Sequence, residues 1–224
     1  IKPNLMQTLE NTPALIHTGP FGNIATGNSS VIADKIGIHM CDYLITEAGF
    51  GADMGAERFF NIKCRVSGMK PDAAVLVATV RALKAHSGLF KVVAGKPLPA
   101  EMLQENPEDV RSGAANLAKQ IENVLAHGVS PVVAINAFPT DFASEHDVIR
   151  EIAESMGARV AVCTHFSDGG AGAVDLANAV VAACDEPNNF HFLYDESASL
   201  KEKISAVATK IYGAKEVTAD AKVR

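Results

Sequence analysis

One short apolar run, P-V-V-A-I-N at residues 131–136, constrains the fold more than any other stretch of the chain. It has the length of one strand and no polar residue on either face before Asn136, which is typical of a central parallel strand covered on both sides. The run then breaks into A-F-P-T-D at 137–141. Ligands of open α/β sheets collect at the carboxyl ends of strands, so we expect Asn136, Phe138 and Asp141 to lie at a binding site.

The same kind of break recurs where the apolar run 159–163 passes into Thr164, His165 and Phe166. Rings on two neighbouring strand ends can enclose a flat heterocycle, gaining about 0.5–1.5 kcal/mol per stacked pair beyond the area buried. Phe138 and Phe166 are therefore candidates for such a slot. The alternative is that both are ordinary core residues, and these residues by themselves leave the two readings open.

Composition limits the partners of the chain. The 224 residues carry a net charge of −6 without a concentrated basic cluster, which argues against a nucleic-acid surface. No apolar run approaches the roughly 20 residues that span a bilayer, so we expect small-molecule partners and no membrane. Four separated cysteines without a C-x-x-C pair favour a reducing compartment, the cytoplasm. The chain opens at Ile1 rather than Met and stops in a polar tail, which suggests a segment of a longer polypeptide.

Strand and helix candidates alternate along the chain, which predicts an α/β fold with a doubly wound, mainly parallel sheet and flanking helices. The expected strands are 14–17, 42–46, 73–78, 131–136 and 159–163. The expected helices are one outlined by Val31, Ile32, Ile36 and Met40 and capped by Ser29 or Ser30, then 107–127, 144–156, 173–184 and 200–212. Residues 89–106 are rich in proline and are expected to form an excursion or flap.

Glu47 directly follows the expected strand 42–46 and is succeeded by Gly49, Gly51 and Gly55. A carboxylate at a strand end beside glycines can direct Mg²⁺ or water, so Glu47 is the leading catalytic and metal candidate. The three glycines approach a dinucleotide fingerprint, but their spacing is G-x-G-x-x-x-G.

Other segments could hold anions. Arg81 and Lys84 share one face if their segment is helical, and that face could bind a phosphate or carboxylate; solvated helix charges are the alternative. The glycine-rich loops 19–30 and 168–172 could offer backbone N–H groups at helix starts.

Taken together, the motifs resemble those of one family. The stretch V-A-T-V-R-A-L-K-A-H-S-G at 77–88 resembles a signature of formate–tetrahydrofolate ligase. Five further motifs agree in order: K-P-N-L-M-Q-T-L-E at 2–10, H-T-G-P-F-G-N-I-A at 17–25, T-E-A-G-F-G-A-D-M-G at 46–55, A-I-N-A-F-P-T-D at 134–141 and C-T-H-F-S-D-G-G at 163–170. The resemblance covers nearly the whole chain.

This resemblance implies a P-loop NTPase-like, ATP-dependent ligase in which formate is phosphorylated and the formyl phosphate is captured by N10 of tetrahydrofolate. ATP with Mg²⁺ would be used, a monovalent cation is a further candidate, and the parent would be a homo-oligomer. The family's lysine-bearing phosphate loop lies N-terminal to the matched region, and no G-x-x-x-x-G-K-[ST] occurs here. Residues 1–224 then form a single, incomplete α/β segment that is inactive without the rest of the parent enzyme.

By matching positions, Phe138 and Phe166 correspond to the aromatic pair that stacks on the pterin ring. The remaining assignments are Phe50 and Asp141 for folate, Asn136, Arg81, Gly49 and Gly51 for nucleotide or phosphate, and Glu47 for catalysis and metal. Three positions depart from the family pattern: Phe166 is often tryptophan, Thr26 is commonly histidine, and Ser87 is usually glycine.

Two other functions remain as alternatives. The first is a dinucleotide-binding oxidoreductase domain that uses Gly49, Gly51 and Gly55, although no suitable acid for a ribose follows about twenty residues later. The second is a non-catalytic structural or interaction fragment.

Overall fold

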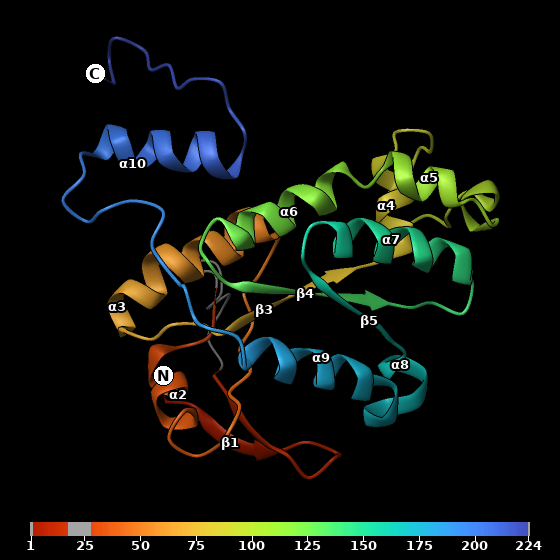
Figure 1. Cartoon of the computed structure of the whole chain (residues 1–224), viewed down its shortest axis with the longest axis horizontal. Helices are drawn as coiled ribbons and strands as arrows, with labels where there is room; N and C mark the ends of the chain where they lie inside the picture. Colours follow the sequence, from red (N-terminus) through yellow and green to blue (C-terminus); the bar gives the residue numbers. More distant parts are fainter. Residues whose placement is uncertain (1, 18–27, 224) are drawn as a thin grey trace. The chain divides into compact units, whose positions relative to one another are not determined.

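A computed structural model describes residues 2–17 and 28–223 (Figure 1). Its internal contacts divide the chain into two units, where the sequence analysis expects one α/β segment. Pro71–Phe190 form the first, called the sheet unit; Ile1–Lys70 together with His191–Arg224 form the second, called the hairpin unit.

The sheet unit is built on a parallel sheet with the order β3 (Ala73–Ala78), β4 (Ser130–Asn136) and β5 (Arg159–Cys163). These three strands match the predicted ones, and both pairings are parallel. Because Asn136 pairs with Cys163, β4 and β5 end at the same edge, as expected of neighbouring strands. The central strand is buried from Pro131 to Ile135, as its unbroken apolar run predicts.

Helices cover both faces of this sheet. Helices α6 (Ala115–Leu125) and α7 (Ala143–Ser155) lie on one face and α9 (Val174–Cys184) lies on the other (Figure 1). Helices α4 (Val80–His86) and α5 (Pro107–Ser112) contact α7 and extend that first layer. The connecting segments hold the short helices η3 (Ala100–Leu103), α8 (His165–Asp168) and η4 (Gly169–Ala173).

The predicted helix 107–127 is wrong as a single element, since it is divided between α5 and α6. Its start is as expected: Asn106 Oδ1 accepts the N–H of Glu108, and Pro107 occupies the first turn. The break falls at Gly113, where an added Cβ would lie 1.7 Å from the carbonyl oxygen of Leu83 in α4. Only glycine allows this approach, and glycine also favours an interruption of the helix at this position.

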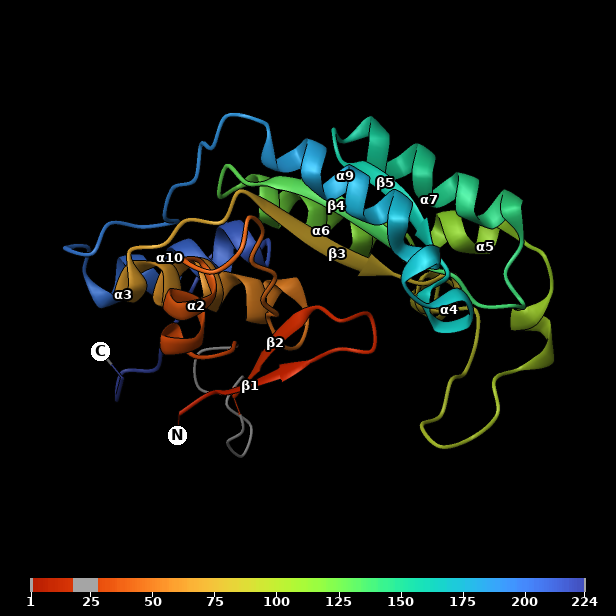
Figure 2. The same cartoon turned by 90° about the horizontal axis from the view of Figure 1, so that it is seen from below.

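Residues 89–106 leave α4 and return to α5, and η3 is their only helix or strand. Figure 2 shows this segment as a long loop that reaches away from the sheet. It has the form expected of an excursion.

The hairpin unit begins with β1 (Asn4–Gln7), which pairs antiparallel with β2 (Pro13–Ile16) (Figure 2). The predicted strand 14–17 therefore exists but belongs to a hairpin, not to the parallel sheet. The predicted strand 42–46 is wrong, because these residues, all described, form no strand. Their side chains are mostly exposed, and an apolar run forms a buried strand only where a neighbouring strand and covering layers exist. In the described part of the chain, the parallel sheet thus has three strands instead of five.

Helix α2 (Val31–Gly37) starts at Ser30, whose hydroxyl accepts the N–H of Ala33 at 3.0 Å, as predicted. The prediction that its apolar residues form the buried face is wrong. Ile32 is 58% exposed, while Asp34 is buried and pairs with the buried Lys63 at 2.5 Å. Lys63 lies in a helical stretch that was not predicted from the sequence, formed by η1 (Ala52–Ala56), η2 (Phe59–Cys64) and α3 (Arg65–Ser67).

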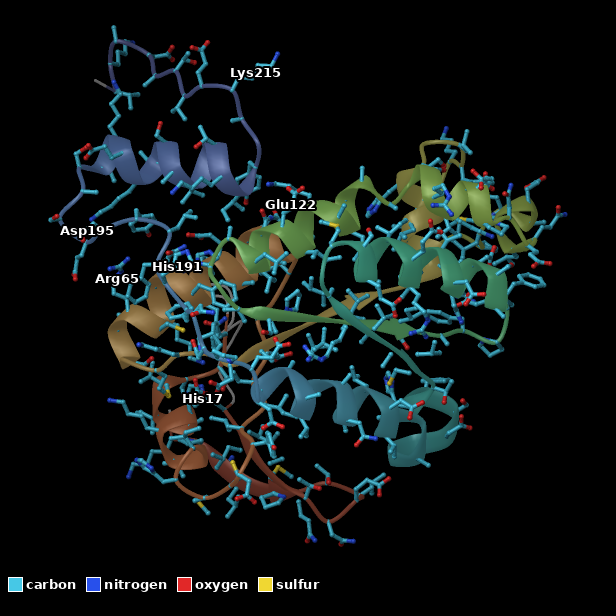
Figure 3. All side chains as sticks on the ribbon, in the orientation of Figure 1. His17, Arg65, Glu122, His191, Asp195 and Lys215 are labelled. Atoms are coloured by element: carbon cyan, nitrogen blue, oxygen red, sulfur yellow. The ribbon has the colours of Figure 1, made fainter. Side chains whose placement is uncertain are left out.

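Polar contacts join the two chain segments of the hairpin unit. The amide of the buried Asn61 accepts the N–H of Leu193 at 2.9 Å. Arg65, marked in Figure 3, stacks over Phe192 at 3.9 Å and donates to the carbonyl of Tyr194. The unit ends with α10 (Leu200–Ala206) and η5 (Val207–Ile211), close to the predicted helix 200–212. Within the described residues, no helix is both long and apolar enough to cross a membrane.

Candidate functional site at the carboxyl edge of the sheet

The turn after β4 is closed by its own aspartate. Asp141 Oδ2 accepts the backbone N–H of Phe138 at 2.9 Å, and the backbone N–H of Asp141 donates to the Phe138 carbonyl at 2.9 Å. The Asp141 side chain is only 2% exposed and lies 3.4 Å from His146 Nε2. Asp141, predicted to bind folate, is thus turned into the loop and determines the position of Phe138.

The ring of Phe138 is half-buried and is covered by a cation. The Arg81 guanidinium carbon lies 3.8 Å from the ring centroid, and Arg81 Nη2 donates to Thr140 Oγ1 at 3.0 Å. Arg81 is the third residue after β3 and lies in the first turn of α4, where Thr79 caps the helix by accepting the N–H of Ala82. The geometry places Arg81, predicted to hold a phosphate, on an aromatic ring.

Phe166 lies in α8, three residues after the last residue of β5, and is 92% exposed. This exposure excludes the reading of Phe166 as an ordinary core residue. The glycine-rich segment that follows packs tightly on the strand end: an added Cβ at Gly172 would lie 2.6 Å from Thr164, whose N–H donates to the Gly172 carbonyl. Phe138 and Phe166 therefore follow neighbouring parallel strands, as the proposed slot requires.

Lys84 forms a buried ion pair next to this edge, so it is neither a solvated charge nor open to an anion, the two roles that the sequence suggested. Lys84 in α4 pairs with Glu145 in α7, and each side chain is 1% exposed. Lys84 Nζ also donates to the carbonyls of Met102 and Gln104, at 3.1 and 2.6 Å. Glu145 accepts the backbone N–H groups of Asn106 and Phe142, at 3.0 and 3.1 Å.

This network satisfies a buried ammonium and a buried carboxylate, and it ties the end of the excursion to the start of α7. A glutamate in the first turn of a helix was a usable signal for Glu145. The burial of Lys84 had no local signal.

In the hairpin unit, Glu47 is exposed in an irregular segment, next to Ala48, which forms an isolated bridge with Asn28. Its predicted place at a strand end is therefore wrong. Phe50 is 61% exposed and has a positive φ of 68°, with the Arg58 guanidinium 6.0 Å from its ring.

The glycines around Phe50 have a packing role. An added Cβ at Gly55 would lie 1.8 Å from the Gly49 carbonyl, so the backbone passes itself very closely there. Gly51 immediately precedes η1. The departure at Thr26, and most of the motif at 17–25, lie outside the described residues.

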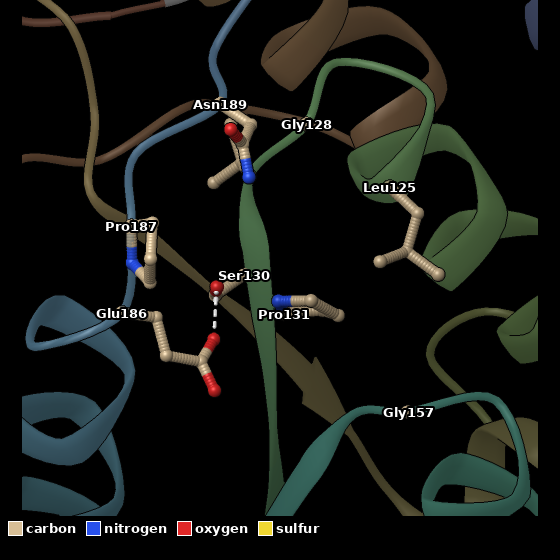
Figure 4. A pocket seen from close by; sticks show the side chains of 9 residues that line it. Leu125, Gly128, Ser130, Pro131, Gly157, Glu186, Pro187 and Asn189 are labelled. Carbon is tan, nitrogen blue, oxygen red and sulfur yellow. Dashed lines mark hydrogen bonds between the residues drawn. The ribbon is translucent and has the colours of Figure 1, made fainter.

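A hollow of about 390 Å³ lies at the opposite edge of the sheet, near the amino ends of β4 and β5 (Figure 4). Ser130 donates to Glu186 there, and Arg159 pairs with Glu186 at 2.7 Å. The hydrogen bond from Arg159, and to a smaller extent that from Ser130, lowers the pKa of Glu186. Because open α/β sheets bind ligands at the carboxyl ends of their strands, we retain the Phe138 edge as the candidate site.

The parallel three-stranded sheet with helices on both faces defines the sheet unit as an α/β fold, and in such folds small ligands bind at the carboxyl ends of the strands. The family model for formate–tetrahydrofolate ligase matches residues 1–224. The chain belongs to the formate–tetrahydrofolate ligase family.

Individual relatives agree with the family match. Proteins named formate–tetrahydrofolate ligase from Saccharopolyspora erythraea, Cutibacterium acnes and Roseiflexus castenholzii are 70%, 67% and 58% identical to it, over 97%, 96% and 97% of this chain. The matched part is 39%, 38% and 39% of those relatives, so the chain spans about two fifths of their length.

Proposed function

We propose that the full-length protein containing this chain joins formate to tetrahydrofolate at the expense of ATP, giving 10-formyltetrahydrofolate through formyl phosphate. The observation that carries the proposal is the family match over all 224 residues, together with identities of up to 70% to proteins of that name. The same match supports a cytoplasmic enzyme that acts on small molecules as a homo-oligomer.

For the folate ring, we propose the edge of the sheet unit that carries Phe138 and Phe166. A folate contact by Phe50, in the hairpin unit, is proposed from the family resemblance alone. Phe138 is held by its turn and Phe166 is exposed, so each can offer a face to a planar ligand. Asp141 contributes by closing the turn that carries Phe138.

For the nucleotide, we propose Asn136 in the sheet unit. A role in nucleotide binding for Gly49 and Gly51, in the hairpin unit, is proposed from the family resemblance alone. Glu47 is an exposed carboxylate, and within the described residues no three His, Cys, Asp or Glu side chains are grouped to hold a metal. One carboxylate suits Mg²⁺ that arrives with ATP, because this ion usually takes one or two carboxylates plus phosphate oxygens. Mg²⁺ would neutralise phosphate charge when bound. A monovalent cation is a further proposed activator.

We also propose that the sheet is incomplete and that the full-length protein has a P-loop NTPase-like fold. Among the described residues β3 pairs only with β4, and Val77 in β3 is 70% exposed. Such an open edge offers unpaired backbone groups to another strand. The rest of the full-length protein would supply that strand and a lysine-bearing phosphate loop.

The first test compares the isolated 224-residue chain with the full-length protein. With formate, MgATP and tetrahydrofolate, we expect product from the full-length protein and none from the isolated chain, because the chain has no phosphate-loop lysine motif to stabilise the transferring phosphoryl group. Product formed by the isolated chain would contradict the assigned role of the missing part. Calorimetric binding of NAD but not of folate or ATP would support the oxidoreductase alternative instead.

A second test addresses Glu47 in the full-length protein. Glu47→Gln should lower kcat and shift the Mg²⁺ concentration needed for half-maximal rate, while Glu216→Gln, at an exposed glutamate of the same unit, should not. Unchanged rates for Glu47→Gln at every Mg²⁺ concentration would contradict the proposed role.

A further inference from the structure

Helix α4 is linked to the Phe138 turn directly through Arg81 and indirectly through Lys84. Arg81 covers the Phe138 ring and bonds to Thr140, while Lys84, one helical turn later, acts through Glu145 on the backbone N–H of Phe142. We infer that Arg81 is a positioning residue for the folate ring, because it occupies one face of Phe138 and leaves the other face for the pterin. This inference rests on the proposed function and assigns Arg81 to folate instead of ATP.

The contact has the geometry of a direct stack. At 3.8 Å from the ring centroid, the guanidinium is in van der Waals contact with the ring and attracted by its negative face. Its second anchor, Thr140, lies within the turn that Asp141 closes. A planar guanidinium can stack and donate a hydrogen bond at the same time, whereas an ammonium is a point charge.

These contacts hold Phe138 in one orientation before a ligand arrives. A ring that is already ordered loses less conformational entropy on binding, and this preorganisation adds to affinity. With one ring face covered by Arg81, a planar ligand is directed to the opposite face. The stack on Phe138 and the hydrogen bond to Thr140 together fix the guanidinium beside the ring, and on this geometry we assign Arg81 to folate.

The experiment measures binding of tetrahydrofolate and of MgATP to the full-length protein by calorimetry. Arg81→Met should weaken folate binding about 3- to 30-fold, the range expected for a cation–π contact and its associated ordering, and leave the ATP Kd within twofold. The KM for tetrahydrofolate should rise by the same factor with kcat nearly unchanged. Arg81→Lys should recover only part of the loss. Arg111→Met, at an exposed arginine paired with Glu151, is the matched control and should bind both ligands normally.

A double-mutant cycle separates this role from a general structural one. In a Phe138→Leu background, which itself weakens folate binding, Arg81→Met should have no further effect, because Arg81 acts through the ring. An equal loss in both backgrounds would overturn the inference. Weaker ATP binding with normal folate binding would also overturn it and restore the phosphate role. Normal folate binding by Phe138→Leu would overturn the folate site itself, and this inference with it.

Discussion

The sheet unit and the hairpin unit bury their apolar side chains to different extents. The sheet unit has a continuous cluster in which Val110, Ile121, Val133, Ile135 and Ile149 are fully buried. In the hairpin unit, by contrast, strand β1 is exposed along its whole length. Burial of apolar area is the main stabilising term in folding, so the sheet unit should be the more stable of the two.

The hairpin unit instead relies on specific polar contacts. Lys63 pairs with Asp34, Asn61 binds the backbone of Leu193, and Arg65 binds that of Tyr194. Such contacts are directional but contribute little net free energy each. The Phe138 edge belongs to the unit with the larger core, which is where a ligand ring can be held most accurately.

The largest expected effects come from two buried ion pairs, Lys84–Glu145 in the sheet unit and Lys63–Asp34 in the hairpin unit. Lys84→Met or Lys63→Met leaves a buried carboxylate without its partner, which costs about 3–5 kcal/mol. In the isolated chain, hydrogen exchange should show the sheet unit weakened but folded in Lys84→Met, and the hairpin unit unfolded in Lys63→Met. Arg111→Met, at an exposed ion pair, should leave the stability of both units nearly unchanged. If both units stayed folded in both variants, the proposed difference in stability between the sheet unit and the hairpin unit would be contradicted.

A second comparison uses isoleucine truncation. Ile135→Ala removes a fully buried side chain from β4 and should cost the sheet unit about 2–5 kcal/mol. Ile36→Ala removes a 40% exposed side chain from α2 and should cost less than about 1 kcal/mol. Urea unfolding followed by hydrogen exchange in each unit measures both, and a similar cost at the two sites would show that the exposed face of α2 is covered in solution.

Two equally buried cysteines test the opening of each unit. Burial raises the pKa of the Cys64 thiol to about 12, and Cys64 and Cys163 are 2% and 3% exposed. Neither thiol should react with iodoacetamide until its unit opens. We expect Cys64 to be labelled about tenfold faster than Cys163, which corresponds to about 1.4 kcal/mol between the two opening free energies. Peptide mass spectrometry measures the rates, and the reverse order would contradict the ranking of the units.

The smallest expected effect is on the pH dependence of stability, which should have opposite signs in the two units. Burial raises the pKa of Glu57 in the hairpin unit, so its contribution to stability is present below the unfolded pKa of about 4.3 and is lost as pH rises through the folded pKa. Hydrogen bonds from Arg159 and Ser130 lower the pKa of Glu186 in the sheet unit, so its contribution is present above about 4.3 and is lost as pH falls through the folded pKa.

Glu57→Gln and Glu186→Gln should each remove the corresponding pH dependence from hydrogen exchange of its own unit between about pH 3 and 7. Shifts of the same sign in both units would contradict the two pKa directions.

The sequence alone predicted the elements whose signals are local. Strands β3 and β5 begin and end where the apolar runs do, and β4 begins one residue before its run. Helix starts followed from Ser30 and Pro107, because capping and proline geometry depend on neighbouring residues. The predicted helices 107–127 and 144–156 stop before Gly128 and Gly157, which have the positive φ that glycine adopts without strain. The family match confirmed the resemblance read from six motifs.

Tertiary structure decided which elements meet. The run 14–17 forms a strand of a hairpin, and the run 42–46 forms no strand. Strand formation depends on a partner strand that the run itself does not specify. The break at Gly113 depends on the Leu83 carbonyl of another helix. Likewise, the sequence suggests that Arg81 is a cation available to an anion. Only the packing of α4 against the turn after β4 places it on Phe138. Such contacts join residues far apart in the chain, so no local pattern encodes them.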